Sequence, residues 1–301
     1  MEVHQNKALS RIIQCFALFL VVRLVEELFI IPRYINTKGV VACVGGFVIL
    51  LFYIRFINKP LEEIGMIFSG HKIRKGILLA ALFNVIPAVI VYAVEYGRLS
   101  SYPGYTTFSV FYDSVDHSYS AAGIGGFLMW AAIGLAIALV HAFFYEMTFR
   151  GLLITLGSRS LPFWGANLIQ SGLYTFWYLI PVVRVLVYYS GVYSLKRIAV
   201  LFVVTLVYEM LTAVKLGLLR SSTGAVWSCI FDHLAFAYIL DMIHLQFTAT
   251  DMSVSLDAKY YTRIIAYQLI SLLMVTVYYF IKKQKIREKQ RVREMQIEQG
   301  T

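Results

Sequence analysis

The sequence contains little charge for its length. Only 15% of its 301 residues are Asp, Glu, Lys or Arg, against about 25% in an ordinary soluble domain. Hydrophobic residues make up 59% of the chain, and the mean hydropathy is +0.70. This composition excludes a soluble globular enzyme and a disordered protein, and it predicts a polytopic membrane protein.

Cysteine is scarce, and the motifs of soluble enzymes are absent. The three cysteines, Cys15, Cys43 and Cys229, all lie in apolar runs, and an odd, buried set provides no disulfide framework. The chain contains no HExxH, GxSxG, P-loop or CxxC pattern, so the usual hydrolase, nucleotide and metal signatures are missing. We therefore expect no cofactor, and no metal, because His233 alone would be a weak metal site.

Eight apolar runs are long enough to cross a bilayer as helices. A helix needs about 20 apolar residues to span the hydrocarbon core, and the alternation typical of an outer-membrane barrel is absent. We therefore predict an all-α, polytopic membrane bundle of about eight transmembrane helices. Their expected ranges are 9–31, 39–57, 76–97, 122–149, 162–182, 198–217, 224–243 and 260–281.

Loop charges indicate an orientation. The 55–75 loop is rich in Lys and Arg, whereas the 98–121 and 244–259 loops carry aspartates, and a dense basic run follows the last predicted span from Lys282 to Arg293. The positive-inside rule then places both termini in the cytoplasm. The net charge of +10 is thus explained by segments that face anionic membrane lipid, and we expect no nucleic-acid partner.

Ionisable residues inside apolar runs are the candidates for function, because charge is costly at membrane depth. Glu146 and Arg150 are four residues apart at the end of one predicted span, so they share a helix face and can form an ion pair. The plainer interpretation of this pair is structural. His233 lies in the middle of another span, where a histidine usually forms a hydrogen bond between helices.

The other charged residues in the spans have plainer interpretations. Asp232 precedes His233, and adjacent residues point about 100° apart on a helix, so we expect them not to form one compact ligand pair. Glu209 is expected to pair with an arginine of another span. Arg23 and Glu27 can pair at i, i+4 spacing, and we expect them to snorkel to the outer interface.

Three short motifs follow one another in an order that resembles a known family. Residues 145–151 read Tyr-Glu-Met-Thr-Phe-Arg-Gly, residues 171–178 read Ser-Gly-Leu-Tyr-Thr-Phe-Trp-Tyr, and residues 222–227 read Ser-Thr-Gly-Ala-Val-Trp ahead of His233. The order resembles the CPBP family of intramembrane proteases, the CAAX-protease and bacteriocin-processing group also called Abi proteins. The motifs of that family have the forms EExxFRG, FxxxH and HxxxN.

The resemblance extends over roughly residues 58–243, which would form a CPBP-like core. Residues 1–57 are then an N-terminal transmembrane hairpin. Residues 244–301 are a C-terminal transmembrane helix with a basic cytoplasmic tail. The resemblance also implies a location, the bacterial cytoplasmic membrane.

The sequence departs from the family at three of four polar positions. The family's first glutamate, which is thought to activate water, aligns with Tyr145, and the FxxxH histidine aligns with Tyr178. The HxxxN asparagine aligns with Ala237, whereas its histidine is kept as His233. The second glutamate of the first motif is also kept, as Glu146.

These replacements remove groups that hydrolysis would need. Hydrolysis by this route needs a base that takes a proton from water, and a tyrosine phenol, with an ordinary pKa of about 10, is a poor base at pH 7. Losing one oxyanion donor costs about 10²–10³ in rate. Around a regular helix Glu146 points about 100° away from Tyr145, which argues against Glu146 replacing the lost base.

The resemblance and the replacements together predict a catalytically degenerate pseudoprotease. We expect a binding or assembly factor for a transmembrane or peptide partner, in which Arg150 and the FRG and TGxxW elements support helix packing. The alternative is an active intramembrane endopeptidase that uses Glu146 and His233 on prenylated, leader-peptide or membrane substrates. A small-molecule transporter is a third interpretation, which discontinuous helices in pseudo-symmetric halves would favour.

Overall fold

The computed structural model describes residues 2–31, 39–58, 60–101, 104–110, 123–249 and 256–299. Helices account for most of these residues. The π-helical segments η1 (Glu26–Ile30) and η3 (Glu146–Leu153) directly continue α1 and α4, so that each forms one longer helical rod. The remaining helices are α1 (Glu2–Val25), α2 (Val40–Phe56), α3 (Gly70–Leu99), α4 (Gly123–Tyr145), α5 (Ile154–Gly157), α6 (Phe163–Tyr189), α7 (Leu195–Thr223), α8 (Trp227–Met242) and α9 (Leu256–Gln299).

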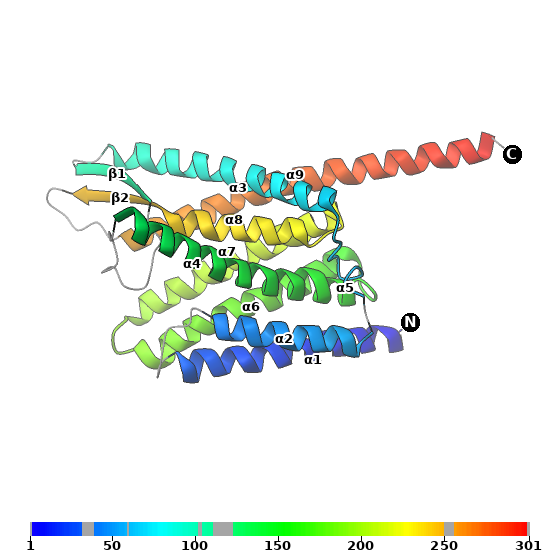
Figure 1. Cartoon of the computed structure of the whole chain (residues 1–301), viewed down its shortest axis with the longest axis horizontal. Coiled ribbons are helices and arrows are strands. Elements are labelled where there is room, and N and C mark those ends of the chain that lie inside the picture. The colour runs from blue at the N-terminus through cyan, green and yellow to red at the C-terminus, as the bar shows by residue number, and fades with distance from the viewer. Residues whose placement is uncertain are drawn as a thin grey trace.

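The long helices run side by side and form one bundle (Figure 1). Helix α8 packs against α3 and α4, and α7 packs against α6 and α9. The beginning of α1 and the end of α9 lie at the same end of the bundle, and α9 extends well beyond its neighbours there (Figure 1). An even number of membrane crossings, as predicted, requires the two termini to lie at the same end.

Two strands accompany the helices and were not predicted. Strand β1 (Gly104–Val110) pairs antiparallel with β2 (Ile243–Ala249), in a register that joins Gly104 to Ala249 and Val110 to Ile243. The pair lies at the end of the bundle opposite the termini (Figure 1). Both segments contain the aromatic and β-branched residues that favour strands. The bundle is all-helical as predicted, and this ribbon is the exception to an all-α chain.

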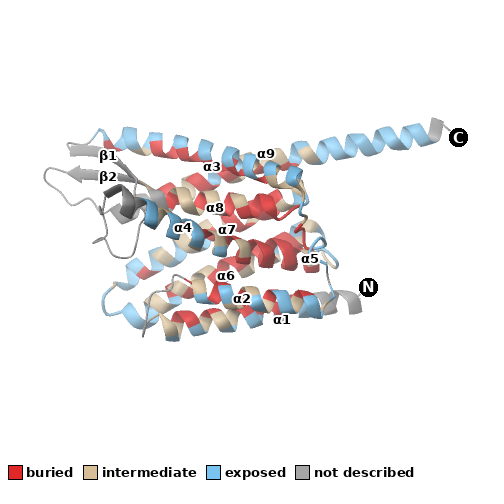
Figure 2. Ribbon diagram, viewed as in Figure 1, coloured by how far each residue is buried: buried red, intermediate tan, exposed pale blue. Residues whose placement is uncertain are grey.

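Within the described residues, five helices are long and apolar enough to cross a membrane, which supports a multi-pass integral membrane protein. They span Gly70–Leu99, Ala131–Gly157, Phe163–Tyr189, Leu195–Thr223 and Tyr261–Ile297. Two further apolar helices, Val40–Phe56 and Trp227–Leu240, are shorter. The outer faces of the helices are largely exposed, while buried residues line the interior (Figure 2). Residues 111–122 and 250–255, which include most of the aspartates used for the orientation, lie outside the described residues.

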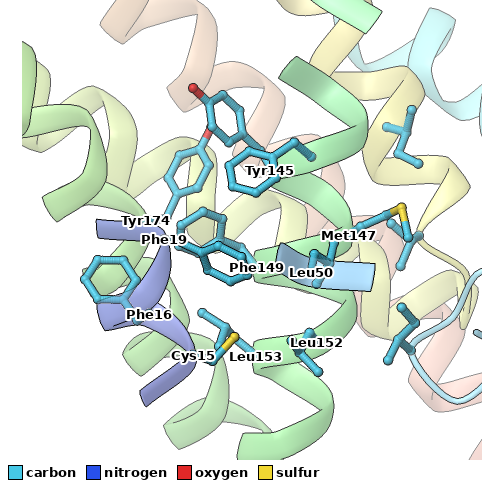
Figure 3. Packing of buried hydrophobic residues seen from close by; sticks show 14 of the residues in the cluster. Cys15, Phe16, Phe19, Leu50, Tyr145, Met147, Phe149, Leu152, Leu153 and Tyr174 are labelled. Carbon is cyan, nitrogen blue, oxygen red and sulfur yellow. The ribbon is translucent and has the colours of Figure 1, made fainter. Parts of the chain in front are cut away.

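An aromatic cluster fills the interior between α1, η3 and α6. Phe149 contacts the rings of Tyr174 and Trp177 edge to face, at centroid distances of 5.1 and 6.4 Å. Phe19 of α1 contacts Phe144 of α4 in the same way, at 5.6 Å. Figure 3 shows Phe19, Phe149 and Tyr174 of this cluster beside the aliphatic side chains of Leu152 and Leu153 on η3. Edge-to-face pairs add to the energy of burial, so this cluster holds η3 at a fixed position.

A glycine allows α6 and α7 to approach each other closely. A Cβ atom at Gly217 would overlap the side-chain amide of Asn167 on α6, and Asn167 is buried. We expect Gly217→Ala to lower the free energy of unfolding by about 1–3 kcal/mol, because overpacking forces neighbouring groups to move. Gly172→Ala is the matched control, since a Cβ there meets nothing within 4 Å. Equal melting temperatures of the two variants in detergent would contradict this packing.

Candidate functional site

The first motif lies on a π-helix that joins α4 to α5. Every residue of η3, from Glu146 to Leu153, is buried. A π-helix bonds each residue to the fifth one before it and therefore turns its side chains away from α-helical directions. Such bulges are frequent at functional sites. Glu146 and Arg150 both lie on this segment.

The structure brings Glu146 and His233 into direct contact. Oε1 of Glu146 lies 2.8 Å from Nδ1 of His233 and accepts a hydrogen bond from Nη1 of Arg150 at 3.2 Å. The Glu146–Arg150 ion pair was expected from its spacing. The contact with His233 was not, because the argument from a regular helix turned Glu146 away from the site. That argument was wrong, because both neighbours reach His233: the Tyr145 ring stacks on the imidazole at a centroid distance of 5.7 Å, while Glu146 contacts its Nδ1.

Tyr145 occupies the centre of the group of side chains at which the family motifs meet. Its ring stacks on His233 at a centroid distance of 5.7 Å and on His141 at 5.6 Å. The same ring lies 5.3 Å from that of Tyr178. Figure 3 shows Tyr145 and Tyr174 approaching each other above the aromatic cluster. The positions that the sequence comparison singled out are therefore neighbours in space.

Tyr174 and Ala237 complete this site. The guanidinium of Arg150 lies over the ring of Tyr174, 4.1 Å from its centroid, and Tyr174 in turn contacts Tyr178 at 4.9 Å. Ala237 lies one turn beyond His233 on α8 and is half-buried. The methyl group of Ala237 provides no hydrogen-bond donor or acceptor. The polar side chains of the site therefore come from the other motif positions described above.

The polar groups of the site are closed off from solvent. Glu146 and Arg150 are fully buried, and Glu209 of α7, which interacts electrostatically with Arg150, is also buried. Within the described part of the chain, Oε2 of Glu146 and Nη2 of Arg150 have no hydrogen-bond partner. Glu209 is thus influenced by an arginine of another helix, but among the described residues it does not form the ion pair that was expected for it.

No protein-family model matches this chain, and no curated protein matches it significantly. The CPBP resemblance therefore stays a prediction that depends on the motif residues. Among the described residues, no three His, Cys, Asp or Glu side chains are placed together as metal ligands. The chemistry open to the site is that of the Glu146 and Glu209 carboxylates, the His141 and His233 imidazoles, the Arg150 guanidinium and the surrounding phenols.

A second buried polar cluster was missed by the sequence analysis. Nζ of Lys215 on α7 lies 2.6 Å from Oδ2 of Asp232 on α8, and both side chains are fully buried. Asn84 of α3 donates to Oδ1 of Asp232 at 2.9 Å, and the Tyr267 hydroxyl of α9 donates to Oδ1 of Asn84 at 2.9 Å. As expected, Asp232 and His233 do not act together, because each belongs to a different cluster. The available signal was a set of polar residues inside apolar runs, but their partners lie far away in the sequence.

A third cluster lies where α1 passes into η1. Arg23 pairs with Glu27 at 2.9 Å, and Glu27 also pairs with Arg184 of α6 at 3.1 Å. Glu26 accepts hydrogen bonds from the backbone N–H groups of Val41 and Ala42 at 3.0 and 2.8 Å, and so caps the start of α2. The predicted Arg23–Glu27 pair is present. The expected snorkelling is wrong, because both side chains are buried among these partners.

Proposed function

We propose that this protein is a CPBP-like, catalytically degenerate membrane protein that binds a transmembrane or peptide partner without cleaving it. The observation that carries this proposal is the state of Glu146, the remaining acid of the first motif. It is fully buried, and a single oxygen is shared between Arg150 and His233. Through this oxygen Glu146 connects η3 to α8, which is a structural role.

The aromatic side chains around Glu146 support the same proposal. A general base has to reach a water molecule that also contacts the substrate. Tyr145 and Tyr178 stand at the two positions where the family carries its water-activating acid and a histidine. Their rings pack against each other and against His233 and Tyr174, so aromatic rings surround the imidazole that contacts Glu146. In this proposal the motif residues stabilise the packing of the helices, and the partner binds to the helical bundle.

The proposal includes a membrane topology. We infer eight membrane crossings with both termini in the cytoplasm of a bacterial cell. Each predicted span overlaps a helix or a continuous helical rod, and the basic segments at 55–75 and 282–293 belong on the cytoplasmic side under the positive-inside rule. The shorter α2 and α8 would cross with the help of the surrounding helices.

An intramembrane endopeptidase is the second candidate, and one contact favours it. The 2.8 Å approach between Glu146 and His233 is within the reach that a base and its orienting partner need. In that case Glu146 would accept the proton of water and His233 would fix its orientation. Prenylated, leader-peptide or membrane substrates remain the expected class.

Comparison of the wild type with Glu146→Gln separates the two candidates. The glutamine keeps the size of the side chain and its acceptor oxygen but cannot act as a base. Each tagged protein is cross-linked in its own membranes and extracted in mild detergent, and the captured partner is identified by intact mass. Glu209→Gln is the matched control for loss of a buried carboxylate. Gel filtration checks that each variant is folded.

We expect the same full-length partner with all three proteins. A partner that is shortened with the wild type and with Glu209→Gln, yet whole with Glu146→Gln, would establish proteolysis and end the binding proposal. Absence of any specific partner from the wild type would also contradict it.

A further inference from the structure

Arg220, in the last turn of α7, is a charged side chain without a counter-charge. Within the residues that the structure describes, no carboxylate pairs with it, and its buried Nε has no hydrogen-bond partner. The buried arginines described above, Arg23 and Arg150, each have an acidic partner. Arg220 as a whole is half-buried, and leaving its buried Nε without a partner is costly, so its guanidinium points to an anion that is not part of the chain.

The backbone is shaped to hold this guanidinium. Gly65 has a φ of +88°, and a Cβ atom there would overlap the Nε, Cζ and Nη2 atoms of Arg220. The carbonyl of Gly65 also accepts a hydrogen bond from the N–H of Val226 at 3.0 Å, which ties the loop to the start of α8. A glycine in a left-handed conformation thus leaves the room in which Arg220 lies.

Arg220 lies at a pocket whose lining carries one net positive charge. The pocket has a volume of about 360 Å³. Arg159 and Glu63 line it as well, and they neutralise each other in an ion pair of 3.1 Å. The remaining lining residues are Ile154, Thr155, Ser158, Phe163 and Ser221. The charge that no lining residue balances is therefore that of Arg220.

We propose that this pocket binds a phosphoryl group, with Arg220 as its main anchor. A guanidinium offers several N–H donors in a fixed fork that matches phosphate oxygens. The hydroxyls of Ser158 and Ser221 add donors, whereas Thr155 already donates to the carbonyl of Gly151 at 2.6 Å. Ile154 and Phe163 offer apolar contact to the rest of the ligand. The site is separate from the Glu146 cluster and does not depend on the proposed function.

Two sources could supply the phosphoryl group, a lipid headgroup or a soluble phosphate ester. The pocket lies where three apolar helices end or begin, at Gly157, Phe163 and Thr223. These ends mark the level at which the hydrocarbon region gives way to headgroups. A lipid phosphate of the adjacent leaflet and a dissolved ester can both approach at this level.

The test uses the full chain purified in dodecyl maltoside without phosphate. Binding is measured by thermal melting and by native mass spectrometry. Three compounds are added separately: dioleoylphosphatidylglycerol, glycerol phosphate, and dioleoylglycerol, which has the same tails but no phosphate. Sodium chloride keeps the ionic strength constant. Arg220→Gln is compared with Arg55→Gln, which removes the same charge from an exposed position at the end of α2.

We expect the wild type and Arg55→Gln to bind a phosphate ligand and to ignore dioleoylglycerol. Arg220→Gln should weaken that binding roughly tenfold or more, because a hydrogen-bonded charge is lost. Binding of phosphatidylglycerol alone identifies a lipid headgroup, whereas binding of glycerol phosphate alone identifies a soluble ester. Failure of both ligands with the wild type, or equal affinity in Arg220→Gln, would overturn the proposal.

If Arg220→Gln does not fold, two other variants test whether Arg220 anchors the phosphoryl group. Arg220→Lys keeps the charge but loses the planar fork, and it should bind the same ligand several-fold more weakly. Gly65→Ala keeps the arginine but fills the space in which its guanidinium lies, and it should weaken binding in the same direction. Unchanged affinity in both variants would exclude Arg220 as the anchor.

Discussion

Replacing Asp232 with leucine should be among the most destabilising single changes in the bundle. Lys215 would then remain fully buried without the carboxylate that now lies 2.6 Å from its Nζ. We expect the free energy of unfolding to fall by about 3–5 kcal/mol, the usual cost of removing one partner of a buried ion pair. Titration with sodium dodecyl sulfate in mixed micelles measures this change.

Two variants test the cause of that loss. The double variant Lys215→Met/Asp232→Leu removes both charges and should recover most of the stability, because hydrophobic replacements of a buried pair are often neutral. Glu63→Gln disrupts an ion pair whose side chains are 42% and 38% exposed, and it should cost less than about 1 kcal/mol. A double variant as unstable as Asp232→Leu would show that the pair is not what stabilises this region.

Replacing Glu146 with leucine should destabilise the protein nearly as much. The change leaves Arg150 fully buried without its partner at 3.2 Å and removes the acceptor that lies 2.8 Å from His233. We expect a loss of about 3 kcal/mol, near the lower end of the range for broken buried pairs, because Glu209 still interacts with Arg150. The same detergent titration provides the measurement.

The comparison with Glu146→Gln isolates the role of charge. Glutamine preserves an acceptor for both Arg150 and His233, so it should cost clearly less than leucine. Glu146→Leu/Arg150→Leu, which leaves no unpaired guanidinium, should be more stable than Glu146→Leu alone. If leucine and glutamine have the same effect, the ion pair contributes little and packing alone holds η3.

The positions of the helices could largely be predicted from apolar runs, whereas their ends could not. The predicted span 198–217 lies inside α7, which runs from Leu195 to Thr223. Apolar windows mark the hydrocarbon region, but helices continue until a local signal stops them. For α7 that signal is Gly224, whose φ of +67° ends the helix. The β1–β2 pair was missed because its strands are far apart in sequence and both fall in predicted loops.

The candidate site was predictable only where its contacts are local. The Glu146–Arg150 pair follows from spacing on one helix. The contact of Glu146 with His233 depends on the packing of α8 against α4 and η3, and the sequence carries no pattern that predicts it. The Lys215–Asp232 pair depends on the packing of α7 against α8, so Asp232 was visible as a charged residue in a span but its partner was not.

Because α9 is long, the basic residues of the tail lie at two different distances from the apolar part of the helix. Its 44 residues extend about 66 Å, roughly twice the thickness of a hydrocarbon core of about 30 Å. Lys282 and Lys283 lie at the edge of the apolar part, within reach of anionic headgroups. Arg291 and Arg293 lie about 12–17 Å farther along the rod, and screening at physiological salt removes most electrostatic attraction beyond about 8 Å. We expect lipid headgroups to neutralise the first group, whereas the second would stay available to acidic molecules in solution.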